Sequence, residues 1–128
     1  MGYGITTTFA NNLLNTVATD TAFSVSEVWI QVYIGDPGAS GDANLADLTT
    51  REQATFQVSS GIMSLLTFPA FTGTTTEIWV AYAAWDDPSL TGSDHVLWTA
   101  PLATPVNATN GGVYTMPAAG IALAPIAS

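Results

Sequence analysis

The chain has 128 residues, ten acidic side chains, one basic side chain (Arg51) and a formal net charge of −9. Nucleic acids are bound through Lys and Arg, and anionic membranes attract basic surfaces, so this charge argues against both partners. Charged residues make up 9% of the chain and hydrophobic residues 48%, whereas soluble domains are about 25% charged. The composition predicts one β domain over residues 1–128, built into a larger assembly, and not an enzyme.

Residues 1–20 are predicted to form an N-terminal arm and a short helix. Phe9, Leu13 and Val17 recur at every fourth position, which places them on one helical face, and a threonine ahead of them can cap the helix. A helix of this length is marginal in isolation. We therefore expect it to dock on the sheet or on a neighbouring subunit.

Two strands with alternating side chains form the predicted centre of the domain, at residues 27–34 and 77–85. In the first, one face carries β-branched residues: Val28, Ile30, Val32 and Ile34. The opposite faces of the two strands carry large rings: Trp29, Tyr33, Trp79 and Trp85. Outward faces of a sandwich are normally polar, so these rings are predicted to form an exposed patch that contacts another protein chain.

The remaining predicted strands are short and separated by turn residues. They cover residues 51–59, 61–68, 95–101, 113–116 and 121–123. Residues 35–50, rich in Gly, Asp and Ser, are expected to form a solvated loop. Short strands at intervals of about 8–12 residues predict an all-β fold, an antiparallel and jelly-roll-like β-sandwich with a short N-terminal helix.

The sequence offers little for catalysis or metal binding. His95 lies beside Ser93 and Asp94, but a catalytic triad depends on geometry and not on adjacency, so a surface histidine is favoured. Asp86, Asp87 and Asp94 could ligate calcium, although the end of a strand explains the first two as well. The chain has no Cys, and no cofactor or metal is expected.

Arg51 and the four tryptophans each leave alternatives open. Arg51 should be paired, either as an anchor across a subunit contact or, more simply, within the chain. Trp29, Trp79, Trp85 and Trp98 fit a core, an interface or a carbohydrate-binding platform. The platform is less favoured because polar partners for a sugar are not clustered with them in the sequence.

The order of several segments resembles a family of small tailed-bacteriophage virion proteins. Its members are commonly labelled tail fibre proteins, and some are similar to capsid decoration or head proteins. The matching segments are the helix at residues 9–17, the Gly-Asp-Pro-Gly turn at 35–38, the strand with Arg51, the Gly-Thr-led strand at 73–86 and the Ala-Ala-Gly segment at 118–120.

Two positions depart from the family pattern, and both changes remove polarity. Tyr33 and Ile34 stand where the family often has His-Thr, and Gly111 and Gly112 stand where it often has Gly-Asp. Contacts that those polar side chains make in relatives are therefore not expected in this chain.

The resemblance implies a structural protein of the virion, assembled in the host cytoplasm, without catalytic residues. Capsid decoration or stabilisation is the favoured role, because the sequence lacks the repeat or heptad of a long shaft. A tail or tail-fibre component is the first alternative and a carbohydrate-binding module the second. The expected partners are the major capsid protein, other virion proteins and further copies of the chain. Arg51 and the helical stripe are predicted to share the interface with the aromatic patch.

Overall fold

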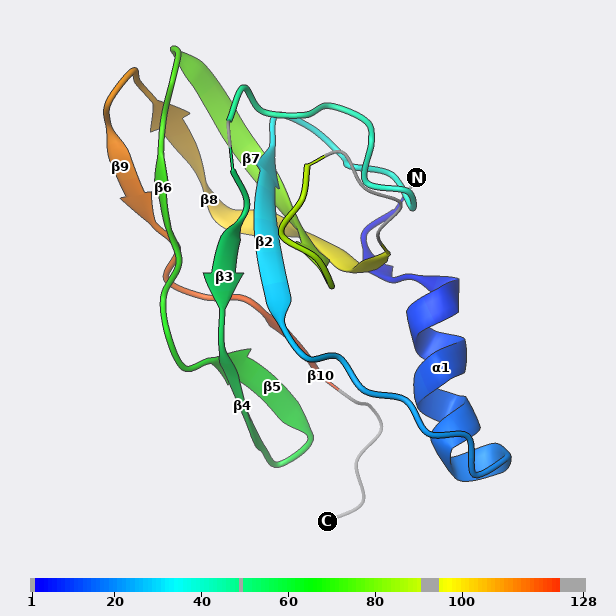
Figure 1. Ribbon diagram of the computed structural model, residues 1–128. Helices are drawn as coiled ribbons and strands as arrows, with labels where there is room; N and C mark the ends of the chain where they lie inside the picture. The colour runs from blue at the N-terminus through cyan, green and yellow to red at the C-terminus, as the bar shows by residue number, and fades with distance from the viewer. Residues whose placement is uncertain (1, 49, 91–94, 123–128) are drawn as a thin grey trace.

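The structure is a computed structural model that describes residues 2–48, 50–90 and 95–122. Its largest sheet is built from β1 (Gly4–Ile5), β2 (Val28–Tyr33), β3 (Glu52–Ala54), β7 (Glu77–Trp85) and β8 (Val96–Ala108). All pairings are antiparallel, in the order β1-β8-β7-β2-β3 (Figure 1). Trp29 of β2 lies opposite Trp85 of β7, and Tyr33 lies opposite Ala81.

Two smaller sheets pack against one face of this sheet, which we call the first face. One contains β4 (Phe56–Ser59), β5 (Ile62–Leu65) and β10 (Gly120–Ala122), and the other contains β6 (Ala70–Thr72) and β9 (Val113–Thr115). Their strand orders are β10-β5-β4 and β6-β9. The prediction of an all-β antiparallel fold with a short N-terminal helix is confirmed, with a second layer that is divided in two.

The main core lies between the first face and the two small sheets. Ile30 and Val32 of β2 are fully buried there, as the alternation of the strand predicts. Aromatic rings connect the layers: Phe56 of β4 lies 5.6 Å from Trp98, measured between ring centres, and Tyr114 of β9 lies 6.2 Å from Trp79. Both contacts are edge-on, an arrangement that adds about 1 kcal/mol to the burial of each pair.

An irregularity in the pairing of β7 and β8 turns Trp79 into this core. Trp79 pairs with Val106 and Ala81 pairs with Pro101, so two steps along β7 are matched by five along β8. This bulge breaks the alternation, and Trp79 packs on the same face as Tyr82, only 1% exposed. The prediction that Trp79 belongs to an exposed aromatic patch is wrong for this reason.

The second face of the large sheet is covered by loops of the same chain. Tyr33 and Trp85 lie on this face and are buried. The loop after β2 returns over them, and the amide of Ile34 donates to the Asn44 carbonyl at 2.8 Å. Gly41 lies so close to the Trp85 ring that a Cβ added to it would clash with the ring atoms. The predicted exposure of Tyr33 and Trp85 is therefore wrong, because residues 35–48 are not merely a solvated turn.

The helix α1 (Thr7–Ala18) begins where the sequence predicts. The Thr6 hydroxyl accepts a hydrogen bond from the Phe9 amide and donates to the Val96 carbonyl at 2.7 Å, which fixes the first turn to β8. Phe9 is buried against Trp98. Val17, two turns further on, is 88% exposed. Only the N-terminal end of the helix docks on the sheet, and its other end projects away from it (Figure 1).

Several strand boundaries differ from the predicted ones. Residues 51–59 form two strands in different sheets, since Thr55 leaves the ladder and its carbonyl accepts from the Leu66 amide instead. β8 is much longer than the predicted 95–101, and β6 falls in a segment for which no strand was predicted. The predicted last strand begins one residue earlier, as β10, and its final residue Leu123 lies outside the described residues.

Candidate functional site

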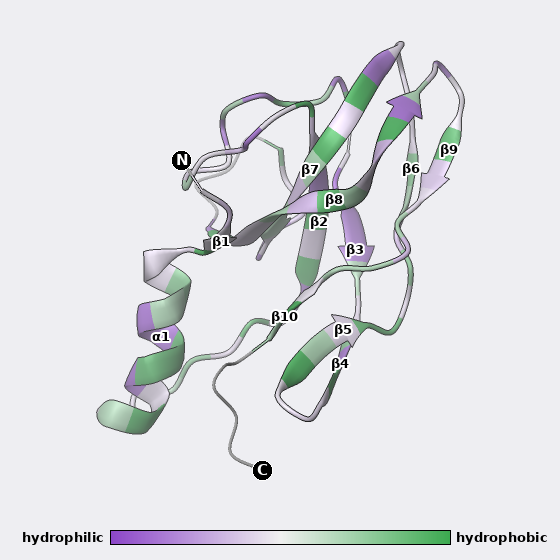
Figure 2. Cartoon of the chain, turned by 180° about the vertical axis from the view of Figure 1, so that it is seen from behind, coloured by the Kyte–Doolittle hydropathy of each residue, from purple (hydrophilic) through white to green (hydrophobic). Residues whose placement is uncertain are grey.

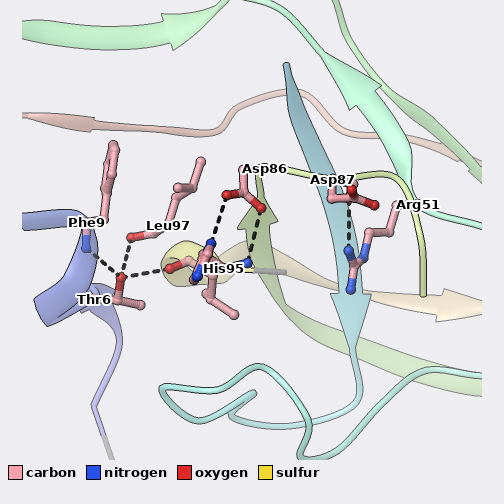
Figure 3. Close-up of polar contacts among 8 residues, drawn as sticks. Thr6, Phe9, Arg51, Asp86, Asp87, His95 and Leu97 are labelled. Atoms are coloured by element: carbon pink, nitrogen blue, oxygen red, sulfur yellow. Dashed lines mark hydrogen bonds and ion pairs between the residues drawn. The ribbon is translucent and has the colours of Figure 1, made fainter. Parts of the chain in front are cut away.

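Arg51 lies at the centre of a buried polar cluster on the second face. It is 5% exposed, and its Nε donates to Gln31 Oε1 at 3.0 Å. One of its terminal nitrogens donates to the Asp87 carbonyl at 2.8 Å (Figure 3). Its guanidinium carbon lies 3.7 Å from the centre of the Trp85 ring. Of the two predicted roles, these contacts favour pairing within the chain over an anchor across a subunit contact.

Tyr33 connects this cluster to the loop after β2. Its hydroxyl donates to the Gly41 carbonyl at 2.8 Å, accepts from the Trp85 indole nitrogen at 3.2 Å, and lies 3.3 Å from Gln31 Oε1. Burial, the largest contribution, raises the pKa of Tyr33 to about 12. The hydroxyl therefore keeps its proton at neutral pH and serves as a permanent donor to the loop.

A polar cavity of about 250 Å³ opens beside the cluster. Its lining combines polar groups with apolar walls: Gln31, Ser40, Gly41, Asp42, Leu45, Arg51, Trp85 and Leu90. Sequence reasoning missed Gln31, Ser40 and Asp42. The one available signal was Gln31 itself, a polar residue within the apolar strand β2.

A second surface of interest is apolar and lies around α1 and the β4–β5 hairpin. Several of its side chains are exposed: Leu14, Val17, Val58, Ile62, Leu66 and Phe68. A groove of about 320 Å³ runs between the two elements, with Phe9, Phe56, Met63 and Trp98 among its lining residues. Both elements extend beyond the large sheet in the same direction, with hydrophobic residues along them (Figure 2). We call this surface the apolar side.

The apolar side is almost free of charge. All ten acidic residues fall between positions 20 and 94, and residues 53–76 and 96–128 contain none, nor any Lys or Arg. Near the groove the acids are Glu27, whose carboxylate accepts from the Trp29 indole at 3.0 Å, and Asp20 just after α1. Five others lie in the loops after β2 and β7: Asp36, Asp42, Asp47, Asp86 and Asp87.

The residues predicted to form an interface do not share one surface. Five are buried within the chain: Phe9, Tyr33, Arg51, Trp79 and Trp85. Leu13 and Trp29 are half-buried, and Val17 is exposed. An interface with another chain can therefore use Leu13, Val17 and Trp29 directly, whereas the other five shape the domain that presents them.

His95 takes part in a local contact at the surface. Its Nδ1 lies 3.2 Å from a carboxylate oxygen of Asp86, and its side chain is largely exposed (Figure 3). Ser93 and Asp94, the other members of the considered triad and calcium site, lie outside the described residues. Within residues 2–48, 50–90 and 95–122, no three His, Cys, Asp or Glu side chains gather as metal ligands would.

The described part of the chain contains no helix with the length and hydrophobicity needed to cross a bilayer.

The chain is thus a small all-β protein with a buried polar cluster on the second face and an apolar side that carries few charges. Residues 4–124 match a family model described as podophage GP4 fiber I protein gp80, and since this is nearly the whole chain, the protein belongs to that family. The prediction of a phage virion protein is thereby confirmed. No curated protein matches the chain.

Proposed function

We propose that the protein is a structural component of a podophage tail fibre, which acts through contacts with other virion chains and not by catalysis. The observation that carries this proposal is the apolar side, where hydrophobic side chains are exposed next to a groove in a chain of net charge −9. Exposed apolar patches of this kind mark contact surfaces. Membership of a family described as fiber proteins supports the location.

The proposed occupant of the apolar side is a second copy of the same chain. Two copies that each carry nine net negative charges repel one another, and the repulsion is smallest where the contacting surfaces have no acids. The acids are concentrated in the loops after β2 and β7, and the hairpin carries none, so the hairpin is the least repulsive place for self-association, with α1 beside it bordered only by Asp20 and Glu27. Val17 and Val58, both largely exposed, are the residues that such a contact would bury.

A matched pair of variants tests this interface. Val58→Ser on β4 should lower the sedimentation coefficient of the assembled protein and its incorporation into particles. Val113→Ser on β9, a similarly exposed valine away from the hairpin, should change neither. An assembly that sediments as wild type in Val58→Ser, or one lost equally in both variants, would contradict the proposal.

Capsid decoration is the second candidate, because the chain has no fixed-period repeat or heptad that would build a shaft by itself. In that role the partner would be the major capsid protein. Immunogold labelling and copy number in purified particles separate the two roles: labelling of the tail supports the fibre, whereas hundreds of copies on the head support decoration.

Nucleic acid is not among the proposed partners. The chain has no Lys and one Arg, and that Arg is buried in the second-face cluster. Phosphate neutralisation needs several exposed cations. A mobility-shift assay with duplex DNA at physiological salt should show no complex, and a salt-sensitive shift would contradict this expectation.

A further inference from the structure

The side-chain amide of Gln31 has one half that is bonded and one half that is free. Its oxygen accepts from Arg51 and lies within reach of the Tyr33 hydroxyl, whereas its nitrogen has no hydrogen-bond partner among the described residues. Gln31 as a residue is only 7% exposed. Among the described residues, every side-chain nitrogen or oxygen that is fully buried has a hydrogen-bond partner, so the unbonded Gln31 nitrogen is not one of the fully buried atoms. The Nε2 group therefore reaches solvent, and the space that Gln31 lines is the polar cavity beside Arg51.

Acceptors stand at the rim of the same cavity. The Asp42 carboxylate and the Ser40 hydroxyl are exposed, and neither makes a hydrogen bond with the described residues. Asp42 and Arg51 both act on the Tyr33 hydroxyl electrostatically, with opposite signs, so the carboxylate and the guanidinium belong to one local cluster. The cavity thus offers amide donors at its base, free acceptors at its rim, and Leu45 and Leu90 among its walls.

This set of groups fits a neutral ligand with several hydroxyls. A hydroxyl can accept from the Gln31 amide and donate to the Asp42 carboxylate at the same time, which a fully deprotonated anion cannot do. Anions are further disfavoured because Asp42 is accompanied by Asp87, whose carbonyl binds Arg51, and because Arg51 is the only cation of the chain. The volume of about 250 Å³ is that of about eight waters.

We propose that this cavity binds one sugar residue of a neutral glycan. The Gln31 amide and the Asp42 carboxylate would hold adjacent hydroxyls, and the two leucines would contact the C–H faces of the ring. Carbohydrate binding was less favoured from the sequence because no polar groups are clustered with the tryptophans along the chain. In the fold, polar groups do gather beside Trp85, so this objection no longer holds. The proposal does not depend on the fibre or capsid location of the chain.

Saturation-transfer difference NMR with four neutral sugars tests the site: glucose, galactose, mannose and rhamnose, each at millimolar concentration. We expect transfer to at least one sugar by the wild-type protein. Gln31→Glu should weaken that binding at least tenfold, because it replaces the two N–H donors while leaving acceptors for Arg51 and Tyr33. Gln57→Glu, which makes the same charge change at an exposed position of β4, should bind within twofold of wild type.

A second variant keeps the test independent of folding. Asp42→Asn alters an exposed side chain, so the domain stays folded, and it should also weaken binding because a neutral amide oxygen accepts a hydroxyl proton less strongly than the charged carboxylate. Absence of transfer from all four sugars to the wild-type protein would overturn the proposal. So would binding that survives unchanged in Asp42→Asn and in folded Gln31→Glu, since the sugar would then occupy another place.

Discussion

The guanidinium of Arg51 lies over the ring of Trp85, with 3.7 Å between its central carbon and the ring centre. The same group donates to the carbonyl of Asp87, 36 residues away in the sequence. One cation thus joins the end of β7, the loop that follows it and, through Gln31, the middle of β2. A desolvated contact of this kind stabilises by about 2 kcal/mol.

Arg51→Lys should destabilise the domain although it keeps the charge. An ammonium cannot donate along two fixed directions to Gln31 and Asp87 while it stacks on Trp85, so at least one buried acceptor loses its donor. We expect the free energy of unfolding, measured in urea, to fall by about 2 kcal/mol. His95→Ala, at an exposed position, should change it by less than about 0.5 kcal/mol. Equal stability of Arg51→Lys and wild type would show that the directed hydrogen bonds of the Arg51 guanidinium do not stabilise the domain.

The Tyr33 hydroxyl predicts a loss of stability in alkaline solution. Its folded-state pKa of about 12 lies above its ordinary value of 10.0, so the folded protein holds this proton more tightly than the unfolded chain. This contribution is complete below pH 10 and is lost as the pH rises towards 12. Between pH 8 and pH 11, wild type should lose about 1.4 kcal/mol more than Tyr33→Phe.

Tyr33→Phe itself should be less stable than wild type at pH 8, by about 1–3 kcal/mol, because the Gly41 carbonyl and the Trp85 indole lose their partner. The other tyrosines are present in both proteins, so any contribution from them cancels in the comparison. Parallel pH profiles for the two proteins would show that the Tyr33 proton is not held in this way.

Hydrophobic periodicity predicted the centre of the fold because it is a local signal. Ile30 and Val32 alternate along β2 and both are buried, and Phe9, the first residue of the helical stripe, is buried three residues after the threonine that caps α1. Trp79 could not be assigned correctly, since the bulge that turns it inward depends on the pairing of β7 with a distant part of β8. A regular strand was the only geometry that the local pattern could indicate.

The second-face site was harder to predict for the same physical reason. Arg51 was identified because it is the only cation, but its partners Gln31 and Trp85 come from two other strands, and Asp87 from a loop. The loop after β2 has the composition of a solvated turn, and its burial of Tyr33 rests on a backbone carbonyl, at Gly41, that composition does not reveal. Such contacts between distant segments carry no periodic signature.

The two ends of the helix should respond differently to the same kind of substitution. Phe9→Ala removes a ring that contacts Trp98 and Phe23 and should destabilise the domain by about 3 kcal/mol. Val17→Ala, at an 88% exposed position, should leave the free energy of unfolding within about 0.5 kcal/mol of wild type. If the apolar side joins two copies, Val17→Ala should still weaken the assembly in sedimentation experiments. Comparable destabilisation by both changes would mean that the whole helix docks on the sheet.

Trp29 and Trp79 occupy equivalent places in the sequence pattern, but their replacement by alanine should destabilise the domain to different extents. Trp79 is fully buried between Phe71 and Tyr114, with its indole nitrogen bonded to Glu77 at 2.8 Å, so Trp79→Ala should cost about 3–5 kcal/mol of unfolding free energy. Trp29 is half-buried, and its indole bonds to the Glu27 carboxylate near the groove.

Trp29→Ala should therefore cost the isolated domain less than Trp79→Ala, because part of the Trp29 side chain is already in water. Urea unfolding monitored by far-UV circular dichroism gives both free energies without reliance on tryptophan fluorescence. If Trp29 also anchors a contact with another virion chain, its loss should reduce incorporation into particles at a temperature where the variant remains folded. A Trp29→Ala variant as unstable as Trp79→Ala would instead assign both rings to the core, and the contact with other chains would have to lie elsewhere on the domain.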